Sequence, residues 1–120
     1  LAGEQPGPGI GDPFGDFGAS RCAVYLKDPS SNELYCRAQN GFDEAMQQAR
    51  LPIGAESIAG AVALTRSPLY VPDVTKESRR SSARSGSELA LPLLVRERTL
   101  GVLDISSDKA PLRFRIRTLL

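Results

Sequence analysis

The sequence predicts an α+β domain built around a central antiparallel β-sheet of about five to six strands flanked by helices. Two pairs of apolar or alternating runs, each pair interrupted by a polar break, are typical of β-hairpins. Between the two pairs lies a segment whose apolar residues recur at helical spacing. The length of 120 residues suits one domain with a single hydrophobic core.

The strongest element is a hairpin near the end of the chain. Two apolar runs, Glu88–Val95 and Leu100–Ser106, lie on either side of a charged break. We predict that Val95 pairs with Leu100. Neither face of this hairpin is clearly polar, so we expect both faces to be covered, as in the middle of a sheet. Pro92 cannot donate a ladder hydrogen bond, which predicts a bulge or a sheet margin at that residue.

The first hairpin is predicted from two alternating stretches, residues 20–28 and 32–40, joined by a turn rich in Pro, Ser and Asn. The pairing that this turn favours places Cys22 and Cys36 together on the apolar face that also carries Val24. We therefore expect both cysteines to be small buried hydrophobes and not a redox pair.

The middle of the chain predicts shorter elements. Residues 41–50 suit one or two helical turns, and residues 51–54 an extended segment. Ser57 is a suitable N-cap for a helix rich in Ala and Gly, whose small side chains allow close packing on the sheet. Residues 69–72 predict a short strand. The Ser- and Arg-rich stretch Thr75–Gly86 predicts a mobile loop or a weak helix.

The two ends of the chain differ from this pattern. Residues 1–18 are dominated by Gly and Pro and predict an irregular segment, so the domain is expected to span residues 19–120. The last residues, 109–120, suit the start of a terminal helix. Because the chain begins with Leu, we expect it to be an excised part of a larger protein.

Composition excludes several classes of function. The net charge is +1 without an evident basic face, which argues against nucleic acid as a partner. No apolar run is long enough to span a membrane, and no signal peptide is visible. The two cysteines are too few for a disulfide framework and badly spaced for zinc, which favours a cytoplasmic location. There is no His, so the commonest general base is missing and we expect no metal site.

Two stretches together resemble a known family. LPIGAESIAGAVALTRSPLYVPDV, a polar loop, and then SELALPLLVRERTLGVLDISS resemble the GAF domain, the small-molecule sensory module of signalling proteins. The resemblance covers roughly residues 20–108. It implies a GAF-like (profilin- or PAS-like) antiparallel sheet with terminal helices on one side and a ligand pocket on the other. Those helices usually form the dimer interface, and here both ends of the chain depart from the family pattern.

The resemblance also implies a pocket roofed by the loop after Val-Pro-Asp-Val and floored by the sheet. Serine hydroxyls and backbone N–H groups there can fix a small polar ligand, and an arginine can meet an anion. Two alternatives remain, namely that the loop is simply solvated and that Asp73 only caps the following segment. The ligand-binding candidates are Tyr70, Asp73, Val74, Arg79, Arg84, Ser87, Glu88 and Ala90.

The resemblance implies a non-catalytic regulatory domain that binds a small molecule of unknown identity. Such a domain would relay its signal to an output domain, a histidine kinase or a cyclic-dinucleotide enzyme, within a two-component or related system. The resemblance also implies a homodimer formed through the terminal helices. The cofactor is unknown, and a covalently bound chromophore is not expected, because the loop holds neither the Cys nor the His of bilin-binding members. One alternative is a ligand-free structural or dimerisation module whose pocket is filled by its own side chains. The side chains expected to fill it are those of Leu69, Leu91, Leu93, Leu103 and Ile105.

The other alternative is a thiol redox enzyme like the free methionine sulfoxide reductases. These GAF-fold enzymes work through cysteines around the pocket, whereas Cys22 and Cys36 are expected on the apolar face of the first hairpin. A thiol buried in apolar surroundings has a raised pKa and is a poor nucleophile. We therefore predict no catalytic residues.

Overall fold

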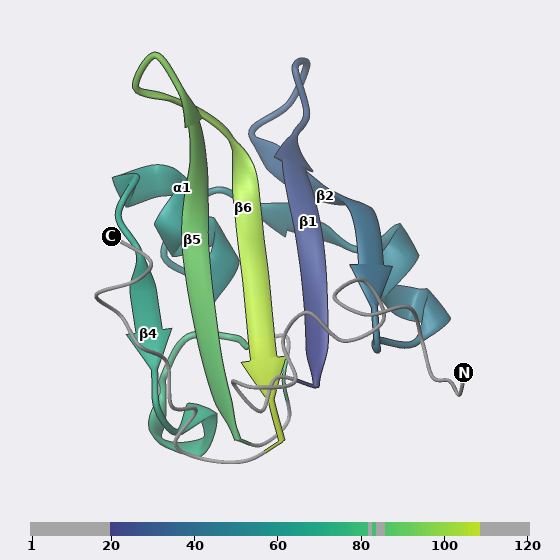
Figure 1. Ribbon diagram of the computed structural model, residues 1–120. Coiled ribbons are helices and arrows are strands. Elements are labelled where there is room, and N and C mark those ends of the chain that lie inside the picture. Colours follow the sequence, from purple (N-terminus) through teal and green to yellow (C-terminus); the bar gives the residue numbers. More distant parts are fainter. Residues whose placement is uncertain (1–19, 82, 84–85, 109–120) are drawn as a thin grey trace, which may run out of the picture.

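The computed structural model describes residues 20–81, 83 and 86–108. Its centre is a six-stranded sheet with the strand order β3-β2-β1-β6-β5-β4, in which all neighbouring strands are antiparallel (Figure 1). The predicted α+β fold is confirmed. The strands are β1 (Arg21–Lys27), β2 (Glu33–Asn40), β3 (Arg50–Pro52), β4 (Leu69–Val71), β5 (Ser87–Val95) and β6 (Arg98–Ser107).

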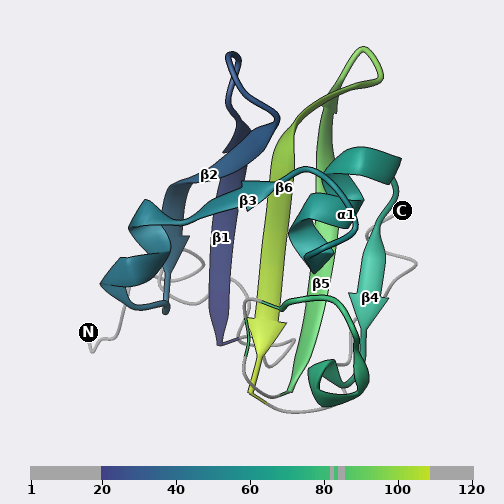
Figure 2. The ribbon, with the colours of Figure 1, turned by 180° about the vertical axis from the view of Figure 1, so that it is seen from behind.

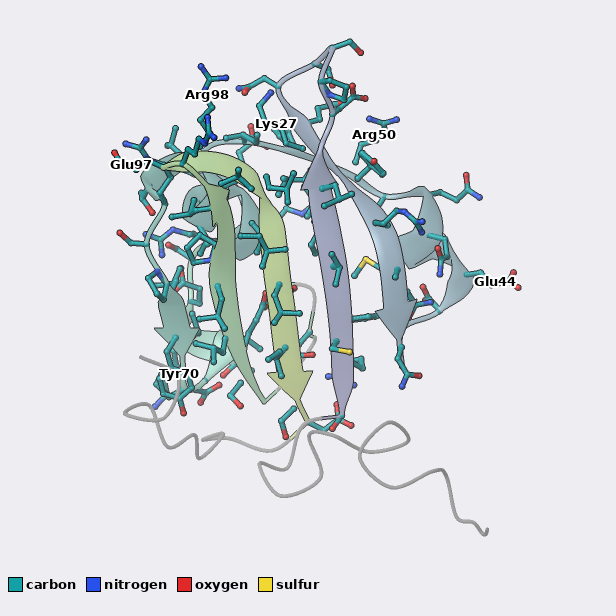
Figure 3. The ribbon with its side chains drawn as sticks, turned by 45° about the horizontal axis from the view of Figure 1, so that its top comes forward. Lys27, Glu44, Arg50, Tyr70, Glu97 and Arg98 are labelled. Atoms are coloured by element: carbon teal, nitrogen blue, oxygen red, sulfur yellow. The ribbon has the colours of Figure 1, made fainter. Side chains whose placement is uncertain are left out.

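The β5–β6 hairpin has a tighter turn than the sequence predicts. Arg96 and Glu97 both have positive φ, 51° and 67°, which matches the two-residue turn that follows the right-handed twist of the strands. Val95 therefore pairs with Arg98, and the predicted pairing with Leu100 is wrong. The register shifts at the bulge between Leu93 and Leu94. Figure 3 shows Glu97 at the tip of this hairpin, beside the first residue of β6.

The first hairpin presents a different face to the core from the predicted one. Ala23 and Tyr25 are buried, whereas Cys22 and Val24 lie on the opposite face and are only half-buried. A bulge between Val24 and Tyr25 sets Tyr25 opposite Cys36. The expectation that the two cysteines share one buried face is therefore wrong, because Cys36 lies on the core face and Cys22 on the other.

The helix α1 (Ile58–Thr65) covers one face of the sheet (Figure 2). The predicted N-cap is confirmed, since the Ser57 hydroxyl accepts a hydrogen bond from the Gly60 N–H at 2.9 Å. A Cβ atom on Gly60 would overlap the carbonyl oxygen of Pro52, so the helix can approach β3 only because glycine stands there. The hydrophobic core lies between α1 and this face.

Two short 3₁₀ helices flank the sheet. The first, η2 (Glu44–Gln48), matches the helical turns predicted over 41–50, and none of its residues is buried. The second, η3 (Val74–Lys76), begins the predicted loop and buries Val74 in the core. No helix in the described ranges is long and apolar enough to cross a membrane. The predictions for residues 1–18 and for a terminal helix over 109–120 lie outside the described residues.

Candidate functional site

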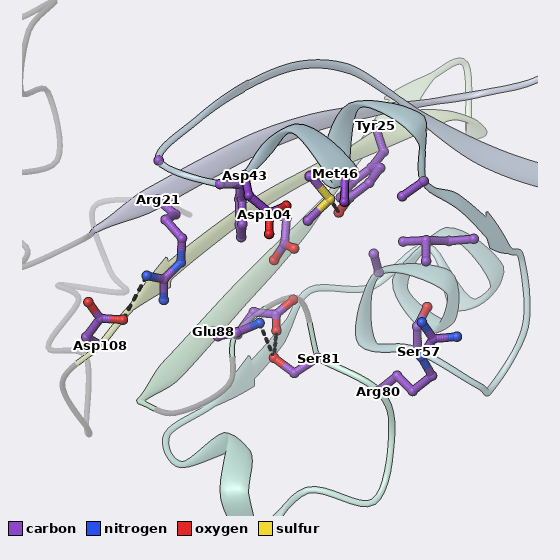
Figure 4. A pocket seen from close by; sticks show the side chains of 17 residues that line it. Arg21, Tyr25, Asp43, Met46, Ser57, Arg80, Ser81, Glu88, Asp104 and Asp108 are labelled. Atoms are coloured by element: carbon purple, nitrogen blue, oxygen red, sulfur yellow. Dashed lines mark hydrogen bonds and ion pairs between the residues drawn. The ribbon is translucent and has the colours of Figure 1, made fainter.

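A cavity of about 750 Å³ lies on the α1 side of the sheet, beside the start of the helix (Figure 4). Its volume is in the range of small-molecule sites. Segments far apart in the sequence form its walls: β1, residues 41–51, the start of α1, residues 80, 81 and 83, and β5 with β6. The described lining is Arg21, Tyr25, Gly41, Phe42, Asp43, Ala45, Met46, Ala49, Leu51, Ser57, Ala59, Arg80, Ser81, Ala83, Glu88, Asp104 and Asp108.

Two buried carboxylates form the acidic part of the cavity wall. Glu88 on β5 is 1% exposed and Asp104 on β6 is fully buried. Asp104 lies in the middle of the sheet, because it pairs with Ala23 on one side and Ala90 on the other. Strand alternation points both acidic side chains toward the cavity. A charge in such a place is costly unless a cation or hydrogen-bond donors face it.

The carboxylate of Glu88 is only half satisfied by the protein. One oxygen accepts a hydrogen bond from the Ser81 hydroxyl, which in turn accepts from the Ala83 N–H at 2.9 Å. The other oxygen, Oε2, is buried and has no hydrogen-bond partner in the described part of the chain. A buried acceptor without a donor is destabilising, so the site favours a ligand that brings a donor.

The start of α1 gives the cavity a second, electropositive part. Three of the first four N–H groups of the helix find acceptors in the Arg80 carbonyl and in Ser57. For the N–H of Ala59, which is buried and lines the cavity, the described residues provide no acceptor. The exposed side chain of Arg80 lines the cavity near Ser57 (Figure 4). An N–H group without an acceptor at a helix start, together with a guanidinium, favours an anion.

Arg21, the first residue of β1, lines one end of the cavity. Its guanidinium pairs with Asp108 at 2.7 Å, and its Nε donates to the Ser106 hydroxyl at 3.2 Å. The same guanidinium stacks over the Phe42 ring, 5.6 Å from the ring centroid. Arg21 is therefore held in place by three neighbours.

A tyrosine and the single methionine of the chain form the apolar wall. Tyr25 is fully buried, and its hydroxyl donates a hydrogen bond to the Met46 sulfur at 3.1 Å. Burial, assisted by the negative charge of Asp104, raises the pKa of Tyr25 well above its usual range. The phenol therefore remains a hydrogen-bond donor at every physiological pH.

The structure places the predicted site residues of β4 and β5 in different surroundings. Glu88 lines the cavity. Ala90 lies on the same face but in the hydrophobic core, and it is outside the lining. Ser87 is buried on the opposite face by strand alternation. Tyr70 on β4 is half-buried, pairs with Leu89 and does not line the cavity.

The predicted site residues of the loop have local roles. Asp73 accepts hydrogen bonds from the N–H and the hydroxyl of Thr75, at 3.0 and 2.6 Å, which is the capping role considered as the alternative. Arg79 pairs with Glu77 at 2.7 Å. Val74 belongs to the core. Arg84 lies outside the described residues.

Sequence reasoning missed most of the cavity wall. Asp104 carried a usable signal, because it is a lone acidic residue inside the apolar strand GVLDIS, where a charge needs a reason. The residues Arg21, Tyr25 and Met46 carried no such signal, since only the fold brings β1 and η2 beside the acidic pair. The five apolar residues proposed to fill a pocket also lie outside the described lining.

Neither cysteine belongs to the described cavity wall. Cys36 is buried and Cys22 half-buried, and both are free thiols. Burial raises the pKa of both thiols, and for Cys22 the nearby charge of Asp104 raises it further. No group of three or more His, Cys, Asp or Glu side chains in the part of the chain that the structure describes could hold a metal ion.

The sequence model of the GAF domain matches residues 16–119. The chain belongs to the GAF domain family. Among curated proteins, no relative matches it. The solved structures that it resembles include GAF domains, which agrees with the antiparallel sheet and the single α-helix described above.

Three of these structures show the range of proteins with this fold. The GAF domain of an Acinetobacter phosphoenolpyruvate-protein phosphotransferase is 17% identical, with a TM-score of 0.77, and the match covers 92% of this chain and 68% of that one. A free methionine-R-sulfoxide reductase from Neisseria meningitidis, in complex with its substrate, is 26% identical (TM-score 0.74; 88% and 62%). A candidate GAF sensor protein from Burkholderia vietnamiensis is 28% identical (TM-score 0.69; 85% and 62%). This GAF domain thus spans less than two thirds of the length of the last two.

Proposed function

We propose that this GAF domain is a regulatory module that binds, without converting it, a small molecule carrying both a protonated amine and a carboxylate. The class is that of free amino acids and their derivatives. The observation that carries the proposal is the buried Oε2 of Glu88, which has no hydrogen-bond partner among the described residues, on a side chain that lines the same cavity as Ala59. The reductase from Neisseria meningitidis, whose substrate is free methionine-R-sulfoxide, supports the ligand class.

Each end of such a ligand finds a complementary group. An ammonium group donates up to three hydrogen bonds, which suits the acidic wall formed by Glu88 and Asp104. A carboxylate accepts from the Ala59 N–H and from the guanidinium of Arg80. The side chain of the ligand would lie against the apolar wall of Tyr25. The protein thus supplies opposite charges on two walls of one cavity, as a zwitterion requires.

The absence of conversion is supported by the position of the thiols. A reductase of the kind considered from the sequence works through cysteines at the pocket. Here Cys22 and Cys36 stand apart from the described lining, on strands β1 and β2, and burial raises the pKa of both. Ser57 and Ser81, which do line the cavity, are engaged in capping α1 and in holding Glu88.

In this proposal, the occupied cavity biases the surrounding segments and so signals to an output domain in the full-length protein, of the kind found in cytoplasmic signalling proteins such as histidine kinases or cyclic-dinucleotide enzymes. Arg80, Ser81 and Ala83, which line the cavity, are the residues whose arrangement a ligand would bias. The candidate GAF sensor from Burkholderia vietnamiensis supports a sensory role.

A thermal-shift panel tests this function. Each amino acid is compared with its two matched analogues, one without the amine and one without the carboxylate; for methionine these are 4-(methylthio)butanoate and 3-(methylthio)propylamine. A ligand at about 100 times its dissociation constant stabilises by about 2.7 kcal/mol, which shifts the Tm of a domain of this size by several degrees. We expect a shift with one amino acid and a smaller or no shift with either analogue.

Two variants locate the binding. Glu88→Gln keeps the shape but removes the charge, and we expect it to lose the ligand-induced shift. Glu97→Gln removes an exposed carboxylate at the hairpin tip and serves as the control, with the shift unchanged. Equal shifts for Glu88→Gln and for the wild type, or equal shifts for the amino acid and its des-amino analogue, would refute the proposal.

A further inference from the structure

The chain contains three sulfur atoms, in Cys22, Cys36 and Met46. Their surroundings differ. Met46 lies on η2, lines the cavity and is half-buried. Cys36 is buried in the core, and Cys22 lies on the opposite face of the sheet.

The two thiols are poorly suited to react with peroxides. The thiolate is the species that attacks a peroxide oxygen, and burial favours the protonated form of both thiols by raising their pKa. A thioether needs no deprotonation, so the reactivity of Met46 depends only on access to its sulfur. The cavity supplies that access.

The Met46 sulfur already has a hydrogen-bond donor beside it. The Tyr25 hydroxyl lies 3.1 Å away and has no other hydrogen bond among the described residues (Figure 4). A thioether is a weak acceptor, whereas a sulfoxide oxygen is a strong one. Oxidation of Met46 would therefore create a polar group next to a buried donor that is ready to bind it.

We propose that Met46 is the peroxide-sensitive site of this domain, and that Tyr25 stabilises its sulfoxide. In the reaction with hydrogen peroxide, the Met46 sulfur attacks one peroxide oxygen, an S–O bond forms and the O–O bond breaks. The sulfur loses two electrons to the peroxide, and the second oxygen leaves as water after proton transfer. The product replaces an apolar thioether on the cavity wall with a polar, chiral sulfoxide.

Oxidation of Met46 needs no bound ligand. Its effect on binding rests on the function proposed above, because a change at Met46 alters the wall against which a ligand side chain would lie. Oxidation of Met46 would also weaken the packing of η2 on the core. None of the residues of η2 is buried, and Met46 is its partly buried contact with the core.

The first test uses the whole chain, treated with hydrogen peroxide under native conditions and digested for mass spectrometry. We expect the peptide with Met46 to gain the mass of one oxygen atom before either cysteine is modified. Modification of Cys22 or Cys36 first, or a native Met46 that stays unmodified while the urea-unfolded chain is oxidised, would overturn the proposal.

The second test addresses Tyr25 through the Tm before and after peroxide treatment. Met46→Leu should show no peroxide-induced change. Tyr25→Phe removes only the hydroxyl and, once oxidised, should lose more Tm than the oxidised wild type, because its sulfoxide lacks the donor. Equal losses in Tyr25→Phe and the wild type would contradict the role of Tyr25, and a loss in Met46→Leu equal to that of the wild type would contradict the site itself.

Discussion

At the scale of single residues, the acidic pair in the sheet is the feature that most constrains function. Glu88 and Asp104 lie on the adjacent strands β5 and β6, are the only acidic residues of those two strands, and are both buried. Apolar residues of similar size would fill these positions without the cost of burying charge. A cationic group in the cavity would give the Oε2 of Glu88 the partner that the described residues do not provide, which is why Glu88→Gln is the variant chosen to test binding.

Asp28, in the turn between β1 and β2, predicts a pH effect on stability. The Ser30 N–H, together with the guanidinium of Arg50 at 2.6 Å, lowers the pKa of the Asp28 carboxyl well below its usual range. Because the folded-state pKa is lowered, the stabilisation is present above the unfolded-state pKa and is lost as the pH falls.

We therefore expect Asp28→Asn, which retains the turn geometry, to be less stable than the wild type at neutral pH. Urea unfolding should show that this difference shrinks as the pH falls below about 4, the usual range of an Asp carboxyl. A difference that stays constant from pH 7 to the acid limit of folding would show that the charge of Asp28 is not its cause.

At the scale of elements, the contact of α1 with β3 is set by Gly60. Alanine is the better helix former by about 1 kcal/mol, so Gly60→Ala would stabilise an isolated helix. Here the new Cβ would overlap the Pro52 carbonyl oxygen, and overpacking of this kind costs about 1–3 kcal/mol. We expect Gly60→Ala to lower the urea midpoint.

Gly54 provides the matched control for this experiment. A Cβ atom built there meets no atom within 4 Å, so Gly54→Ala should leave stability within about 0.5 kcal/mol of the wild type. If Gly60→Ala were as stable as Gly54→Ala, the conclusion that α1 approaches β3 too closely for a Cβ atom at position 60 would be wrong.

The elements themselves were largely predictable from local sequence, but their register was not. The apolar runs of β5 and β6 and the Ser57 cap are local signals, and the structure confirms them. The turn at Arg96 and Glu97 lacks the Asn-Gly signature of a two-residue hairpin, so the sequence pointed to a longer loop. The predicted pairing of β5 with β6 therefore differs from the observed pairing by one or two residues.

The face of β1 was mispredicted for a different reason. The residues Cys22 and Val24 are more apolar than their neighbours, yet Tyr25 is the residue that is fully buried. Its burial is compatible with its polar hydroxyl, because that hydroxyl donates a hydrogen bond to the Met46 sulfur. Both faces of β1 are at least half-covered, so alternation alone does not distinguish them.

At the scale of the whole molecule, the sheet topology explains why the site was only partly predictable. β1 and β6 are neighbours at the centre of the sheet (Figure 1). Arg21 therefore forms an ion pair with Asp108, although most of the sequence separates the two residues. The resemblance pointed to the β5 side of the cavity and found Glu88. The β1 and η2 side depends on long-range packing, which a single sequence does not reveal.

We propose that this cavity holds the ligand between Glu88 and the start of α1. The most direct test is a titration, followed by ¹H–¹⁵N NMR, with the amino acid that gives the largest thermal shift. We expect chemical-shift changes concentrated at Ala59, Ser81 and Glu88, and their loss in Glu88→Gln. Changes confined to the opposite face of the sheet, at Cys22 and Leu91 for example, would contradict it.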